Sequence, residues 1–156
     1  MKLVRLLAPI FLVGLCINNA AETKALALDP AQEQFFSRFR TAIHGEDTRQ
    51  LLQLTHPQAK ACTKVDEQEH YYGLIMKGLV QMLGHQQTIK EISSMKVADQ
   101  DLKPVSDPAA KGSMVWPVPP EEQLLIKYVM NGSEDTATIY IARDQNQWKW
   151  VHRCFQ

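Results

Sequence analysis

The stretch LLIKYVMNGSEDTATIYIARDQNQWKWVHRCF, residues 124–155, decides the fold of this chain. It contains three segments in which side chains alternate with period 2 and branched or aromatic residues are frequent, which is typical of strands with one buried face. One alternating set is Leu124, Ile126, Tyr128, Met130, Ala137, Ile139, Ile141, Trp148, Trp150 and His152. Turn-forming residues at 131–132 and 144–147 separate the segments. The sequence therefore predicts an antiparallel three-stranded meander onto which the earlier part of the chain packs.

Length and composition indicate one folded domain. The chain has 156 residues, of which 45% are hydrophobic and 22% charged, as in ordinary globular proteins. Its formal net charge of zero gives no electrostatic reason to expect a nucleic acid or an anionic membrane as partner.

The first 20 residues have the layout of a secretory signal peptide. Lys2 and Arg5 precede an uncharged, mostly apolar run at 6–17, and small residues at 20–21 offer a cleavage site. The apolar run is short for a membrane span of roughly 20 residues. We therefore expect an exported protein, periplasmic or secreted, with a flexible leader at 21–28 and a domain at 29–156. An uncleaved anchor is the alternative, and only then would the chain be attached to a membrane.

Export determines which of the three cysteines remain in the mature chain. Cys16 leaves with the signal peptide, so Cys62 and Cys154 remain. Two cysteines in an oxidising compartment predict a single disulfide. Two buried free thiols are the alternative.

Three helices are predicted before the first strand, at residues 29–44, 47–55 and 63–83. Asp29 is placed to cap the first helix, and Thr63 to cap the third. The expected buried stripe of the third helix consists of Tyr71, Leu74, Ile75, Gly78, Leu79 and Met82.

The segments between these helices and the meander are less regular. Residues 57–63 are expected to be a connector, and residues 86–97 an imperfect strand that contains a bulge or is curved. Residues 99–113 are expected to be an exposed loop, followed by a short strand at 114–116. The predicted fold class is α+β, with three N-terminal helices packed on a curved antiparallel sheet of four to five strands.

Several features together resemble a known family. They are a long first helix with Phe35, Phe36 and Phe39, the Gly45-Glu46-Asp47 step into a helix with Leu51-Leu52, the His56-Pro57 turn, and the terminal hairpin ending at residues 147–152. Over about residues 29–155 the chain resembles the nuclear transport factor 2-like superfamily, the cystatin-like α+β cone. The resemblance implies a sheet that curls around the long helix and leaves a cone-shaped pocket. Members include isomerases, dehydratases, epoxide hydrolases, transport adaptors and secretion-system scaffolds, so the fold alone does not indicate a reaction.

Two ionisable residues are candidates for chemistry in such a pocket. Alternation places His152 on one face with Trp148, Trp150 and Cys154, where an imidazole could act as acid or base or could be a hydrogen-bonded core residue. Asp66 is the second candidate. The histidines lack the spacing of a zinc pair, so no metal and no cofactor are expected.

The aromatic side chains are the candidates for binding. They are Tyr71, Trp116, Tyr128, Trp148 and Trp150, which would line an open cone or form the core of a filled one. Our first hypothesis is an exported, non-catalytic binding or envelope-assembly domain, whose partner is a protein or a small apolar ligand; a homodimer through the sheet face is also compatible with it. The alternatives are a small-molecule isomerase, lyase or hydrolase, and a membrane-anchored secretion-system scaffold.

Overall fold

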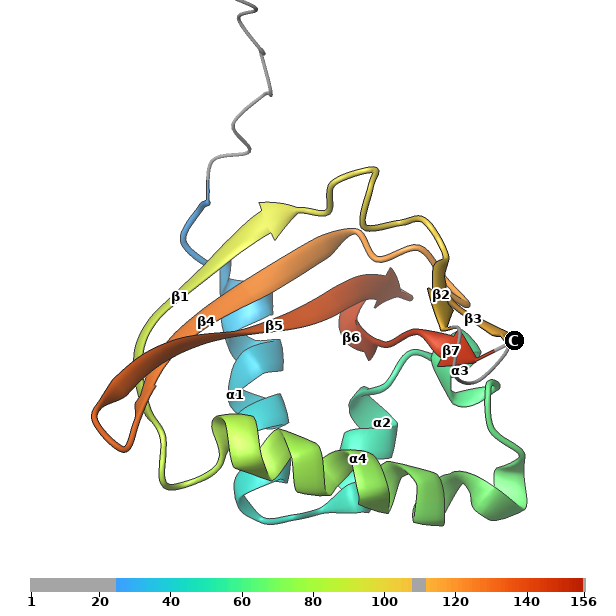
Figure 1. The fold of residues 1–156 in the computed structure, drawn as a ribbon, viewed down its shortest axis with the longest axis horizontal. Coiled ribbons are helices and arrows are strands. Elements are labelled where there is room, and N and C mark those ends of the chain that lie inside the picture. Colours follow the sequence, from blue (N-terminus) through green and yellow to red (C-terminus); the bar gives the residue numbers. More distant parts are fainter. Residues whose placement is uncertain (1–24, 108–111, 156) are drawn as a thin grey trace, which may run out of the picture.

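The computed structural model describes residues 25–107 and 112–155. Within this part, four helices and a 3-10 turn precede the strands of two antiparallel sheets (Figure 1). The helical elements are α1 (Pro30–His44), α2 (Thr48–Leu54), α3 (Pro57–Lys60), η1 (Val65–Glu67) and α4 (Gln68–Leu83). The strands are β1 (Thr88–Lys96), β2 (Val105–Asp107), β3 (Gly112–Val115), β4 (Glu122–Met130), β5 (Ser133–Asp144), β6 (Gln147–Val151) and β7 (Cys154–Phe155). The predicted signal peptide lies outside the described residues. The predicted α+β class is confirmed.

The larger sheet has the strand order β1-β4-β5-β6 and curves over the helices, with α1 and α4 on its concave side (Figure 1). The meander of β4, β5 and β6 is as predicted. Its inward side chains, among them Leu124, Ile126, Ile139 and Ile141, form one hydrophobic core with the helices. Burial of this apolar surface is the main stabilising contribution to the fold.

The start of α1 is determined locally. The Asp29 carboxylate accepts a hydrogen bond from the Gln32 backbone N–H at 2.8 Å, and the Gln32 side chain accepts one from the Asp29 N–H at 3.0 Å. This capping box satisfies two backbone donors at the helix start. The phenylalanines of the helix, Phe35, Phe36 and Phe39, are buried against the sheet and α4.

A bulge, one of the two alternatives predicted for β1, is present between Ile89 and Glu91. Because a bulge adds one residue to one strand, Ile89 and Ile92 both pack against the core despite their odd spacing. On its other edge β1 is joined to the described end of the leader, where Leu26 and Ser94 exchange two backbone hydrogen bonds of 2.7 Å.

The start of the third predicted helix was wrong. Regular α-helix begins at Gln68, not after Thr63, and a 3-10 turn precedes it. The Gln68 side chain donates to the backbone carbonyls of Lys60 and Thr63, at 3.0 and 3.3 Å. These bonds stabilise a folded-back approach that the local sequence did not indicate.

The predicted buried stripe of this helix was also displaced by one residue. The buried residues are Tyr72, Met76, Leu79 and Leu83, whereas Leu74 is 54% exposed and Met82 40% exposed. Both stripes are apolar at helical spacing, so the pattern could not select between them.

The segments 57–63 and 99–113, predicted to be irregular, contain regular structure, and the last predicted strand of the meander is shorter than predicted. Residues 57–60 form α3, because Pro57 suits the first helical position and the His56 ring accepts a hydrogen bond from the Gln58 N–H. The expected loop at 99–113 contains β2 and the start of β3, which form a second sheet of order β2-β3-β7. The chain leaves the larger sheet after Val151, and β7 pairs with β3.

Candidate functional site

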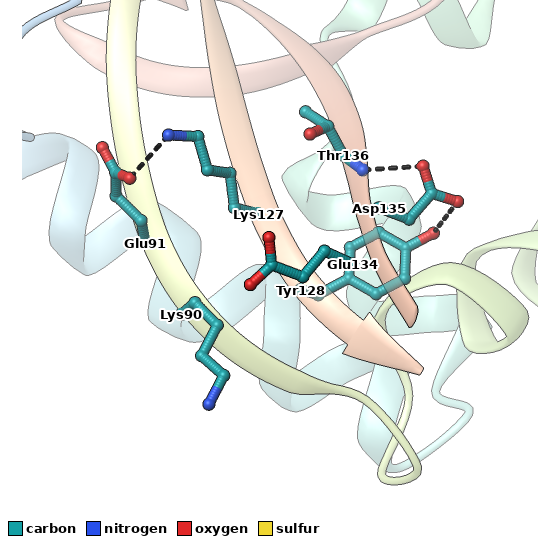
Figure 2. A pocket seen from close by; sticks show the side chains of 7 residues that line it. All are labelled: Lys90, Glu91, Lys127, Tyr128, Glu134, Asp135 and Thr136. Carbon is teal, nitrogen blue, oxygen red and sulfur yellow. Dashed lines mark hydrogen bonds and ion pairs between the residues drawn. The ribbon is translucent and has the colours of Figure 1, made fainter. Parts of the chain in front are cut away.

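A polar hollow lies beside the β4–β5 hairpin (Figure 2). Three of its charged groups have partners in the hollow itself: Lys127 Nζ lies 2.8 Å from a Glu91 carboxylate oxygen, and the Tyr128 hydroxyl donates to Asp135 at 3.2 Å. The Lys127 and Glu91 side chains are more than half exposed. Solvated pairs of this kind contribute little to binding or stability, so we do not take this hollow as the site.

An apolar pocket of about 370 Å³ lies between α4 and the C-terminal strands. Helix α4 contributes Ile75, Gly78, Leu79 and Met82, and the opposite side includes Met114, Trp116, Ile139, Tyr140, Trp150 and His152. The volume is at the lower end of the range for small-molecule sites, and the mostly apolar wall is typical of them. This pocket is the candidate site.

The displaced stripe of α4 explains why the pocket exists. Leu79 is buried, but Met82 is on the neighbouring face and faces the pocket rather than the core. Gly78 lies one turn before Met82 on the same side of the helix, and a Cβ atom added there would meet no atom of the described residues within 4 Å. The absent side chain therefore leaves space on the pocket side of the helix.

His152 borders the pocket and is hydrogen-bonded through both ring nitrogens. Its Nδ1 lies 3.0 Å from the Arg153 carbonyl oxygen, and its Nε2 lies 2.8 Å from the Tyr72 hydroxyl. Since a carbonyl only accepts, Nδ1 carries the proton, and the neutral ring accepts from Tyr72 at Nε2. Burial lowers the pKa of His152, and burial followed by the neighbouring Tyr71 raises the pKa of the Tyr72 hydroxyl. Both effects favour this neutral pair near pH 7.

Arg153 and Trp116 form the opposite rim. The Arg153 guanidinium donates to the Lys103 carbonyl oxygen at 3.0 Å and to the Asp101 carbonyl oxygen. Its central carbon lies 4.8 Å from the centroid of the Trp116 ring, and Trp116 Nε1 donates to the Asp101 carbonyl at 2.8 Å. The stacked pair attaches the loop before β2 to the pocket wall.

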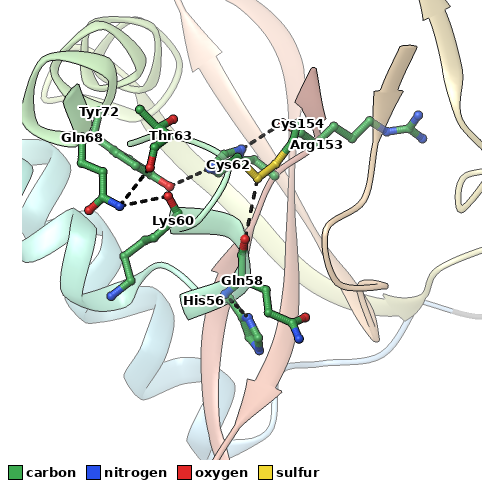
Figure 3. Close-up of a disulfide and its surroundings, with 10 residues drawn as sticks. His56, Gln58, Lys60, Cys62, Thr63, Gln68, Tyr72, Arg153 and Cys154 are labelled. Carbon is green, nitrogen blue, oxygen red and sulfur yellow. Dashed lines mark hydrogen bonds between the residues drawn. A yellow bond between two sulfur atoms is a disulfide. The ribbon is translucent and has the colours of Figure 1, made fainter. Parts of the chain in front are cut away.

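Cys62 and Cys154 face each other at disulfide distance, with Cα atoms 5.8 Å apart (Figure 3). Cys62 lies in the exposed segment after α3, and Cys154 is buried at the start of β7. Since β7 pairs with β3, and Met114 of β3 lines the pocket, this connection supports one pocket wall.

The structure brings three predicted site residues together. Trp116, Trp150 and His152 all line the apolar pocket. Tyr71 lies nearby, with its ring centroid 6.0 Å from that of His152.

The other predicted site residues lie elsewhere. Tyr128 borders the polar hollow, and Asp66 is exposed in η1. Trp148 is buried beneath the Arg143 guanidinium, 4.7 Å from its ring centroid, and away from the apolar pocket.

Sequence analysis did not single out Tyr72 or Arg153. The alternative helical stripe through Tyr72 was a signal for its burial. No sequence signal marked Arg153, because its place depends on where the chain leaves the larger sheet.

Comparison with protein-family models, curated proteins and solved structures gives no match. Among residues 25–107 and 112–155, no group of three or more His, Cys, Asp or Glu side chains is placed to hold a metal ion. In the same part of the chain, no helix is both long and apolar enough to cross a membrane.

Proposed function

We propose that this chain is an exported, non-catalytic binding domain whose pocket between α4 and the C-terminal strands takes a small apolar ligand. The observation that carries the proposal is the pocket itself: about 370 Å³ of open space with mostly apolar walls. Met82 and Met114, on its two sides, are 40% and 38% exposed. A bound ligand would remove this apolar surface from water, which is favourable.

The polar groups at the pocket support binding rather than catalysis. The two ring nitrogens of His152 are engaged by Tyr72 and by a backbone carbonyl, so an incoming substrate would have to displace one of these partners. A general base needs a nitrogen within hydrogen-bond reach of the substrate proton. The isomerase, lyase or hydrolase alternative therefore requires the Tyr72–His152 bond to open.

Export is the second part of the proposal. The charged and apolar pattern of residues 1–20 supports a cleaved signal peptide, and the spacing of Cys62 and Cys154 supports maturation in an oxidising compartment. Intact-mass measurement of the exported protein tests cleavage, since a mass that includes residues 1–20 would instead support the anchored alternative. The nuclear transport factor 2-like resemblance likewise stays a prediction.

The binding experiment uses Gly78. Replacing it by leucine places an apolar side chain into the pocket, because no atom of residues 25–107 or 112–155 lies within 4 Å of an added Cβ. Gly73, on the same helix, also has open space at its Cβ position but does not line the pocket, so Gly73→Leu is the matched control. A glycine inside a helix is less favourable than an alanine by about 0.8–1 kcal/mol. Because both substitutions replace such a glycine, neither is expected to unfold the domain.

The probe is N-phenyl-1-naphthylamine, a neutral apolar fluorophore. We expect the wild type and Gly73→Leu to bind it with similar affinity and Gly78→Leu to bind it at least tenfold more weakly. Equal binding by all three proteins, with circular dichroism showing them folded, would place the probe outside this pocket. No binding by the wild type would overturn the proposal.

A further inference from the structure

We propose that the natural ligand of this pocket is an apolar carboxylic acid, bound as its anion with the carboxylate at Arg153. This inference rests on the proposed binding function and names the ligand class. The structural basis is a guanidinium at the rim of an otherwise mostly apolar pocket.

Among the described residues, no ion pair neutralises the positive charge of Arg153. The guanidinium donates to two neutral backbone carbonyls, those of Asp101 and Lys103. Among the described side chains, no carboxylate lies within 4 Å of it. A guanidinium has five N–H donors, and these two bonds use two of them. Donors therefore remain for a ligand.

Arg153 is also held in place before a ligand arrives. Its two carbonyl partners and the Trp116 ring fix the guanidinium from two sides. It is half-buried, so its charge is less screened than that of a fully exposed arginine. Preorganised, partly desolvated donors give stronger charge-assisted hydrogen bonds to a carboxylate than to a neutral amide or alcohol.

The remainder of the pocket fits the other end of such a ligand. Ile75, Leu79 and Met82 of α4 face Trp150 across the space, and these side chains offer a hydrocarbon chain or ring no hydrogen-bonding partner other than the Trp150 indole N–H. Thr138 and Tyr140 add two hydroxyl groups to the wall. An apolar body with one anionic group matches this combination, whereas a sugar or a polyol would leave most of its hydroxyl groups without partners.

One nearby acid reduces the preference for an anion. Burial raises the pKa of Tyr140, Asp101 raises it further, and Arg153 lowers it. The charges of Asp101 and Arg153 therefore both act on Tyr140, which lines the pocket. Removing the Asp101 charge should therefore increase the affinity for an anion. This gives a variant with an effect opposite to that of removing the Arg153 charge.

The test compares octanoate with octanamide, which share the same chain and differ in charge, by calorimetric titration at pH 7.5 and 50 mM salt. We expect the wild type to bind octanoate at least tenfold more tightly than octanamide. Arg153→Gln should reduce this preference to within twofold, Arg153→Lys should keep most of it, and Asp101→Asn should raise octanoate affinity about two- to threefold. Raising the salt to 500 mM should weaken octanoate binding to the wild type and leave octanamide binding unchanged.

The outcomes separate this inference from the proposed function. If octanamide binds the wild type as tightly as octanoate, the carboxylate assignment is wrong and the apolar binding function stands. The same conclusion follows if Arg153→Gln keeps the preference while folded. If neither compound binds and Gly78→Leu changes nothing for the neutral fluorophore, both proposals fail. The salt titration needs no variant, so it decides the matter even if an Arg153 variant does not fold.

Discussion

Breaking the Cys62–Cys154 connection should strongly destabilise the domain. The two residues are 92 positions apart in the sequence. In the chain-entropy model, a cross-link that closes a loop of this length contributes about 4.6 kcal/mol, because it restricts the unfolded chain. Cys62→Ala is the cleanest perturbation, since Cys62 is exposed and its loss creates no cavity.

The free energy of unfolding is measured by urea denaturation, and the melting temperature by circular dichroism. At this chain length 1 kcal/mol corresponds to about 4 °C, so we expect the melting temperature of Cys62→Ala to fall by roughly 15–20 °C. Dithiothreitol should lower the stability of the wild type by a similar amount and leave that of Cys62→Ala unchanged. Hydrogen exchange should rise first in β3 and β7, because the sulfur bond attaches β7 to the helical part of the chain.

Two results would refute this reasoning. Non-reducing peptide mapping that recovers both cysteines as alkylated free thiols would show that the bond does not form. If the bond is present but its loss changes the free energy of unfolding by less than about 1 kcal/mol, the unfolded chain is not restricted as the entropy model requires.

Three further predictions concern the core, the helix start and pH. Trp150→Ala should cost about 3–5 kcal/mol in urea denaturation, because the buried indole contacts Phe39 and His152; a loss below about 0.5 kcal/mol would contradict its role as a core anchor. Asp29→Ala should cost about 0.5–2 kcal/mol by the same measurement, because it removes the capping box, and an unchanged stability would show that the cap is dispensable. Burial lowers the pKa of His152, so the unfolded state binds the proton more readily and stability should fall as the pH drops below about 6.5. His152→Gln should reduce the loss of stability with falling pH. His44→Asn should remove the part that remains, because burial, followed by His85 and Arg40, lowers the pKa of His44 as well.

Local patterns were sufficient for much of the fold. The capping box at Asp29, the alternation in β4 and β5 and the bulge at Ile89 each depend on neighbours in sequence, and each was predictable. The boundary at Gln68 was not, because its side chain bonds to carbonyls five and eight residues earlier. The second sheet was missed because β3 pairs with a strand from the end of the chain.

The candidate site was predictable only in part. Trp116, Trp150 and His152 were named from the sequence, and the structure brings them together. Tyr128 and Trp148 were named for the same reason, that they are aromatic, yet they lie elsewhere. Residue type and alternation specify which side chains turn inward, but not which of them border open space.

By itself the sequence determined the class of this protein: helices first, then an antiparallel meander, with two cysteines left after a predicted signal peptide. Only the tertiary structure decided which apolar stripe of α4 faces the core and which faces the pocket. It also brought Tyr72 to His152 and placed Arg153 over Trp116. The physical reason is range: caps and periodicity act within a few residues, whereas a pocket is the space left when segments far apart in the chain pack together.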